Sequence, residues 1–119
     1  MLVDDNPANV RFMRDLVGTL EDVALVAVPT ADLGIELARA RNPALVILDI
    51  DVPGVHAFEA MRVLREGPET TRIPVIALSA FASPHDRRRA KAVGFLHFLA
   101  KPVLVDELVS ALESVLQRG

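Results

Sequence analysis

Five short, almost continuously apolar runs alternate with five amphipathic segments along this chain. We expect strands at residues 1–4, 23–28, 44–49, 73–79 and 96–100, and helices at residues 7–20, 31–41, 57–66, 84–93 and 105–117. Strands that are apolar on both faces are typical of parallel sheets covered by helices on both sides. The repeat therefore predicts one α/β fold, with a parallel sheet as its central layer.

Local signals set the helix boundaries. Asn6 before Pro7 is a plausible cap for the first helix, and Thr30 is one for the second. The helix predicted at residues 84–93 differs from the others, because "PHDRRRAKAV" offers only two alanines and Val93 to a core. We expect this helix to dock weakly.

Composition narrows the class of protein. A chain of 119 residues with 51% apolar residues has enough material for one compact domain, which we expect to span residues 1–119. A net charge of -3 gives no reason to expect nucleic-acid binding, and no apolar run approaches the roughly 20 residues of a membrane span. There is no cysteine, tryptophan or tyrosine, which excludes thiolate chemistry and weakens any interpretation that needs aromatic stacking. A cytoplasmic protein is the default expectation.

Polar residues fall at the ends of four predicted strands: Asp4 and Asp5, then Asp49, Ser79 and Lys101. In a parallel sheet these ends share one edge, where ligands bind at the point at which the connections change direction. In the strand order 2-1-3-4-5, the acidic residues would line one crevice, with the hydroxyl and the lysine on its far wall. Each residue alone has an ordinary explanation as a cap, turn or surface residue, but their convergence on one edge does not.

The combination of residue types indicates phosphoryl chemistry. Three close carboxylates repel one another unless a cation joins them, and Mg²⁺ prefers such hard oxygen ligands. The metal and Lys101 would neutralise phosphoryl oxygens, and Ser79 would hydrogen-bond one of them. Asp49, which projects between these groups, is then a candidate nucleophile that forms an acyl phosphate.

With these residues assembled, the sequence resembles the receiver domain of two-component response regulators, the CheY-like superfamily. The matching stretches are "VDDN", "LVILDIDVPG", "PVIALSA" and "FLAKPV", at residues 3–6, 45–54, 74–80 and 98–103. The resemblance spans nearly the whole chain and implies a flavodoxin-like (βα)5 three-layer sandwich with strand order 2-1-3-4-5. It also implies that the domain is a signalling module and not an enzyme with an external substrate.

The resemblance further implies a set of roles at the acidic end of the sheet. Asp49 would be the phosphoacceptor and would take its phosphoryl group from a histidine kinase or histidine phosphotransfer protein. Asp5 and Asp49 would bind Mg²⁺ (or Mn²⁺) directly, together with the backbone carbonyl of Asp51, and Asp4 would act through water.

A second set of implied roles concerns the response to phosphorylation. Lys101 would contact the phosphoryl group, and the Lys101–Pro102 bond is a candidate cis peptide. Ser79 and Phe98 match the switch pair of the family, a hydroxyl that follows the phosphate and an aromatic ring that turns inward behind it. The fourth helix, fifth strand and fifth helix would then signal to a downstream protein target.

Some positions depart from the family pattern or stay open. The first strand is short, and His56 stands where the family often has an acidic residue after the turn. We interpret His97 as a packing residue and not a ligand, and the basic run at residues 87–91 as a solvated face. The Asp51 side chain could either orient or repel an attacking water, and the sequence does not decide the sign.

Three rival functions stay open at this point. "DIDV" resembles the nucleophile and acid pair of haloacid-dehalogenase-type phosphatases, although those motifs end the first strand and this one ends the third. A pseudo-receiver that works without phosphate would share the fold. A flavin-binding flavodoxin is disfavoured, because the chain lacks tryptophan, tyrosine and a phosphate-cradling loop.

Overall fold

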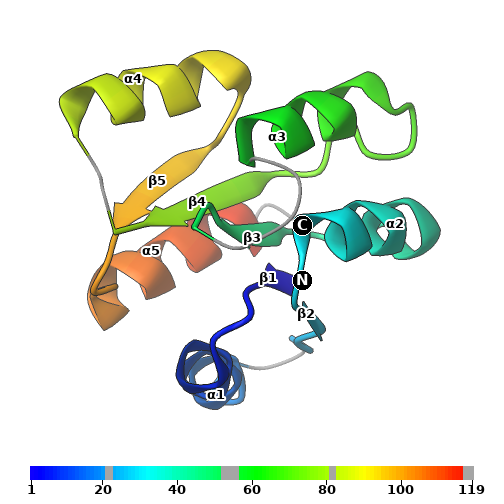
Figure 1. Ribbon diagram of the computed structural model, residues 1–119. Coiled ribbons are helices and arrows are strands. Elements are labelled where there is room, and N and C mark those ends of the chain that lie inside the picture. Colours follow the sequence, from blue (N-terminus) through cyan, green and yellow to red (C-terminus); the bar gives the residue numbers. More distant parts are fainter. Residues whose placement is uncertain (21–22, 52–56, 81–82, 117–119) are drawn as a thin grey trace.

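The computed structural model describes residues 1–20, 23–51, 57–80 and 83–116. Within these ranges, five parallel strands form one sheet in the order β2-β1-β3-β4-β5 (Figure 1). The strands are β1 (Leu2–Val3), β2 (Ala27–Val28), β3 (Val46–Asp49), β4 (Val75–Ser79) and β5 (His97–Ala100). The predicted α/β class, strand order and flavodoxin-like architecture are therefore confirmed.

Five helices of the described residues cover the two faces of this sheet. They are α1 (Pro7–Val17), α2 (Ala31–Arg41), α3 (Ala57–Glu66), α4 (Pro84–Val93) and α5 (Val105–Leu116). Helices α2, α3 and α4 lie on one face and α1 and α5 on the other, which gives three layers (Figure 1). The predicted caps are present, since the Asn6 side chain accepts hydrogen bonds from the backbone of Ala8 and Asn9, and that of Thr30 accepts one from Leu33.

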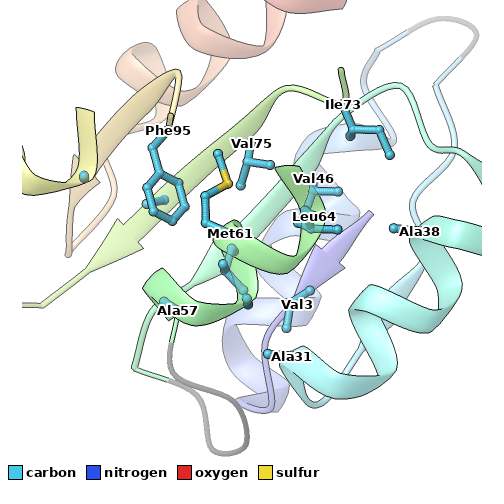
Figure 2. Close-up of a cluster of buried hydrophobic side chains, with 14 residues drawn as sticks. Val3, Ala31, Ala38, Val46, Ala57, Met61, Leu64, Ile73, Val75 and Phe95 are labelled. Carbon is cyan, nitrogen blue, oxygen red and sulfur yellow. The ribbon is translucent and has the colours of Figure 1, made fainter. Parts of the chain in front are cut away.

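The sheet separates two buried clusters of apolar side chains. Figure 2 shows the cluster under α2 and α3, where Met61 and Leu64 of α3 face Val46 and Val75 of the sheet. The second cluster joins the opposite face of the sheet to α1 and α5, with Leu2, Ile47, Ile76, Leu108 and Leu112 among its members. Both faces of β3 and β4 are therefore covered, as their unbroken apolar sequences predict.

Several predicted elements are shorter in the structure. The strand expected at residues 23–28 is confined to Ala27–Val28, because its partner β1 presents only Leu2 and Val3 to a ladder. The helix expected at residues 7–20 ends at Val17 and is followed by a tight turn, in which the backbone of Leu20 donates to the Val17 carbonyl. The other four strands each lose one or two predicted residues at their ends, and position 117 of the last predicted helix lies outside the described residues.

Helix α2 closely approaches β1, the strand between β2 and β3. Gly34 of α2 is buried, and a methyl group at this position would lie 2.7 Å from Cγ2 of Val3. Glycine in the middle of a helix costs roughly 1 kcal/mol relative to alanine, so this residue is explained by packing and not by helix propensity. The contact fixes the height of α2 above the strand that carries the first acidic residues.

Helix α4 docks through few apolar side chains and two arginines. Ala90 is its only buried residue, which confirms the expected scarcity of apolar contacts. The Arg89 guanidinium lies 4.2 Å from the centre of the Phe58 ring on α3, and the Arg87 guanidinium lies 5.6 Å from that of Phe98 on β5. Arg87 also donates a 3.0 Å hydrogen bond to the Phe98 carbonyl. Cation–π contacts thus supply part of the docking that apolar side chains supply elsewhere.

No helix in the described part of the chain is both long and apolar enough to cross a membrane.

Candidate functional site

Asp49 is the last residue of β3, at the carboxyl edge of the sheet. The three residues before it are buried strand residues, and the Asp49 side chain follows them into the interior, so that the residue is only 3% exposed. Its Oδ1 atom accepts a 2.9 Å hydrogen bond from the backbone of Asp51. A buried carboxylate needs a partner of opposite charge or several hydrogen bonds, so the surroundings of Asp49 decide its chemistry.

Lys101 supplies the positive charge beside Asp49. The backbone of Lys101 donates a 2.8 Å hydrogen bond to Ser79, which ties the end of β5 to the end of β4. From there the ammonium reaches across β4 and lies 2.5 Å from Oδ2 of Asp49. Burial alone would lower the pKa of Lys101, but its hydrogen bonds and Coulomb attraction to Asp49 and Asp51 outweigh that effect and raise the pKa. The ammonium is therefore held in its charged form.

Asp4 lies beside Asp49 on the other side. It follows β1, is 3% exposed, and accepts a 2.9 Å hydrogen bond from the backbone of Asn6. Burial raises the pKa of Asp4, the Asn6 hydrogen bond opposes the rise, and the nearby Asp49 carboxylate adds to it. This pair of crowded carboxylates is destabilised in a way that a bound cation would relieve.

Asp5 differs from Asp4, because its side chain is exposed and lines a shallow hollow beside α1 with Arg11 and Asp15. The described residues contain no group of three or more acidic or histidine side chains placed to hold a metal ion. Mg²⁺ commonly binds through one or two carboxylates and completes its octahedron with waters, so the hard oxygen donors of Asp4 and Asp49 fit such an ion. The ligand set implied by the resemblance, including Asp5, stays a prediction.

Ser79 and Phe98, the predicted switch pair, lie on the neighbouring strands β4 and β5. Ser79 ends β4 and is 1% exposed, with its backbone in register with Ala100. Phe98 is half-buried against the cluster under α3 and α4, and Arg87 packs on its ring. The two residues therefore belong to adjacent strands, but the aromatic ring already contacts α4.

The Asp51 side chain has partners that the sequence did not indicate. Its Oδ2 atom accepts a 3.1 Å hydrogen bond from the backbone of Ala80 and lies 3.3 Å from the Lys101 ammonium. The spacing of Asp49 and Asp51 does not by itself show that both side chains contact Lys101. The contacts with Lys101 and with Ala80 depend on how the fold places β4 and the end of β5, so the sequence could not predict them.

Two smaller predictions can be compared with the structure, and a third cannot. The Lys101–Pro102 peptide bond is cis. His97 is half-buried on β5, with Nε2 3.3 Å from the Ser114 hydroxyl of α5, which agrees with a packing role. His56 lies outside the described residues.

Comparison with known proteins supports the resemblance to receiver domains along almost the whole chain. Residues 1–113 match the response regulator receiver domain family. This chain belongs to that family. It is 31% identical over 116 residues to the polar-differentiation response regulator DivK of Brucella ovis, an alignment that covers 98% of this chain and 94% of DivK.

Solved structures of receivers share the fold. A response regulator from Desulfuromonas acetoxidans has a TM-score of 0.86 and 27% identity, covering 98% of this chain and 94% of that one. The receiver domain of the sensor histidine kinase PA1611 from Pseudomonas aeruginosa PAO1 has a TM-score of 0.85 and 27% identity, covering 96% and 93%. The PA1611 structure has a magnesium ion coordinated in its active-site cleft. This chain is thus a receiver domain of two-component systems.

Proposed function

We propose that this receiver accepts a phosphoryl group on Asp49 from a histidine kinase or a histidine phosphotransfer protein. The observation that carries the proposal is a carboxylate only 3% exposed at a strand end, hydrogen-bonded to the Lys101 ammonium at 2.5 Å. Burial keeps water away from the carboxylate, and the lysine offsets its charge and holds it in place. A structural ion pair would need neither the edge of the sheet nor a second buried carboxylate, Asp4, beside it.

In the proposed transfer, the protein forms a single new covalent bond, between Asp49 and phosphorus. A carboxylate oxygen of Asp49 attacks the phosphorus atom of a phosphohistidine, an O–P bond forms, and the P–N bond breaks. The electron pair of that bond returns to the imidazole nitrogen of the donor. Lys101 offsets negative charge on the phosphoryl oxygens as the bond order changes, and a rigid strand end holds Asp49 in line.

We propose that Asp5 and Asp49 hold Mg²⁺ (or Mn²⁺) directly, together with the Asp51 backbone carbonyl, and that Asp4 acts through water, as the resemblance implies. When bound, the ion supplies charge neutralisation at the phosphoryl oxygens and relieves the repulsion between the carboxylates. The raised pKa of Asp4 supports this assignment, because a carboxylate that is costly to ionise gains most from a cation.

We place the response in Ser79 and Phe98, next to α4. A phosphoryl group adds up to about two negative charges and new acceptor oxygens at the sheet edge, which the Ser79 hydroxyl can approach. Movement of Phe98 would then disturb its contact with Arg87 and shift α4. We expect the face formed by α4, β5 and α5 to bind a downstream protein in the cytoplasm.

The decisive experiment is intact-mass spectrometry after incubation with acetyl phosphate and Mg²⁺. Wild type should gain one phosphoryl group, and Asp49→Asn should gain none. Asp32→Asn, which removes an exposed acid on α2, is the matched control and should behave as wild type. A folded wild-type protein that gains no mass from acetyl phosphate or from a phosphorylated histidine protein would instead support a phosphate-independent pseudo-receiver.

A further inference from the structure

The Asp51 carboxylate occupies two hydrogen-bond donors at the same edge of the sheet as Asp49. One is the backbone N–H of Ala80, at 3.1 Å, just after the end of β4. The other is the Lys101 ammonium, which lies 3.3 Å from Asp51 and 2.5 Å from Asp49. Both donors contact the same oxygen of Asp51, so this single atom lies between β4 and the lysine. The Asp51 side chain is about one-third exposed and can leave by moving toward solvent.

A phosphoryl group on Asp49 would need these same donors. Its oxygens carry the charge that a preorganised site must offset, and they lie one bond beyond the carboxylate oxygen to which phosphorus is attached. Among the described residues, these oxygens can use the ammonium already bonded to Asp49, the N–H of Ala80 after the neighbouring strand β4, and the Ser79 hydroxyl. A carboxylate oxygen and a phosphoryl oxygen are both anionic acceptors, so they exclude each other sterically and repel each other electrostatically.

We propose that Asp51 is an internal competitor of the phosphoryl group, an anion that must leave Ala80 and Lys101 before Asp49 can be stably phosphorylated. The inference rests on the proposed function and deepens it, because it assigns the Asp51 side chain a role apart from its backbone carbonyl. Asp51 is a positioning residue in this scheme. It holds the Ala80 N–H and the Lys101 ammonium in place in the unphosphorylated protein, and it lowers the affinity of the site for phosphoryl oxygens.

The test uses beryllium fluoride, which adds to a carboxylate as a phosphoryl mimic without covalent turnover. The full chain would be titrated with beryllium chloride and excess fluoride in the presence of Mg²⁺, with binding followed by calorimetry. Asp51→Asn and Asp51→Ala should both bind on the order of tenfold more tightly than wild type, as expected when the contacts of an anionic side chain with Ala80 and Lys101 no longer have to be broken. Both should also be phosphorylated faster by acetyl phosphate. Asp32→Asn, with the same change in net charge, should match wild type.

A second readout needs no variant. In the wild-type protein, the carbon resonance of the Asp51 carboxylate and the amide resonance of Ala80 should both shift as beryllium fluoride binds. Equal or weaker binding by the Asp51 variants, or an Asp51 resonance that stays in place while Asp49 is occupied, would overturn the inference. If wild type itself neither binds beryllium fluoride nor gains a phosphoryl group, the proposed function fails. If only the Asp51 effects are missing, the proposed function stands and this inference falls.

Discussion

Lys101→Met isolates the charge of the buried pair, because methionine keeps most of the length of the side chain. Without the ammonium, Asp49 keeps its hydrogen bond from the backbone of Asp51 but has lost the positive charge beside it, and its side chain is only 4% exposed. Breaking a fully buried pair costs about 3–5 kcal/mol, but the Lys101 side chain is 23% exposed, so water screens part of the interaction. We therefore expect the free energy of unfolding to fall by about 2 kcal/mol.

Urea unfolding followed by circular dichroism measures this loss directly. With a slope of about 2 kcal/mol per molar urea, the midpoint should fall by about 1 M. Lys91→Met, on the exposed side of α4, is the matched control and should leave the midpoint almost unchanged. The double variant Asp49→Asn/Lys101→Met should lose much less than the sum of the single variants, since the pair is removed as a unit.

The pH dependence of stability gives a further check on the direction of the Lys101 pKa shift. Because the pKa of Lys101 is raised in the folded protein, its contribution is fully present below the ordinary lysine value of 10.5 and is lost only as pH rises through the higher folded value. The difference between wild type and Lys101→Met should therefore be the same at pH 7 and pH 9. Equal stability of the two proteins, or additive losses in the double variant, would refute the reasoning.

Two further predictions concern Asp4, which lies beside Asp49, and Gly34, which packs on β1. Burial and Asp49 raise the pKa of Asp4, so the stability of the metal-free wild type should fall as pH rises from the ordinary value of 3.8 through that higher pKa. Asp4→Asn should flatten this decline in thermal melts with EDTA and should gain less from Mg²⁺ than wild type; a larger gain would contradict the assignment. Gly34→Ala places a methyl group 2.7 Å from Val3, a contact so short that we expect overpacking of about 2–3 kcal/mol. Against a helix gain of about 1 kcal/mol, the net loss should be about 1–2 kcal/mol. In urea titrations Val3→Ala should relieve part of that loss, and additive losses would show that this contact is not the cause.

The fold and the residues of the site could be predicted from the sequence for one reason. Unbroken apolar strands such as Val46–Leu48 must be covered on both faces, and parallel strands bring their ends to one edge. Placing Asp4, Asp49, Ser79 and Lys101 on that edge requires no knowledge of side-chain rotamers. The alternation of strands and helices follows from the same pattern, and the strand order was implied by the resemblance to receiver domains.

Other features could not be predicted, because they depend on distances between segments far apart in the chain. The length of β2 is set by how many residues β1 offers it, and the sequence of residues 23–28 does not contain that information. The hydrogen bond from Ala80 to Asp51 joins residues 29 positions apart, and the choice of Asp51 rotamer depends on where Lys101 lies. Likewise, the charged side chains of the basic run on α4 are exposed, as expected, but the sequence does not show that Arg87 and Arg89 reach the rings of Phe98 and Phe58.

Helix α4 buries a single alanine and is secured by Arg87 and Arg89 on the rings of Phe98 and Phe58. Its outward-facing positions are therefore not constrained by the need to fill the interior. Over evolutionary time such positions can change freely while the architecture is inherited intact. Paralogous regulators in one cell can in this way diverge in the partners that they recognise. For the same reason, substitutions at a few exposed positions of α4 offer a route to changing the partner of this domain.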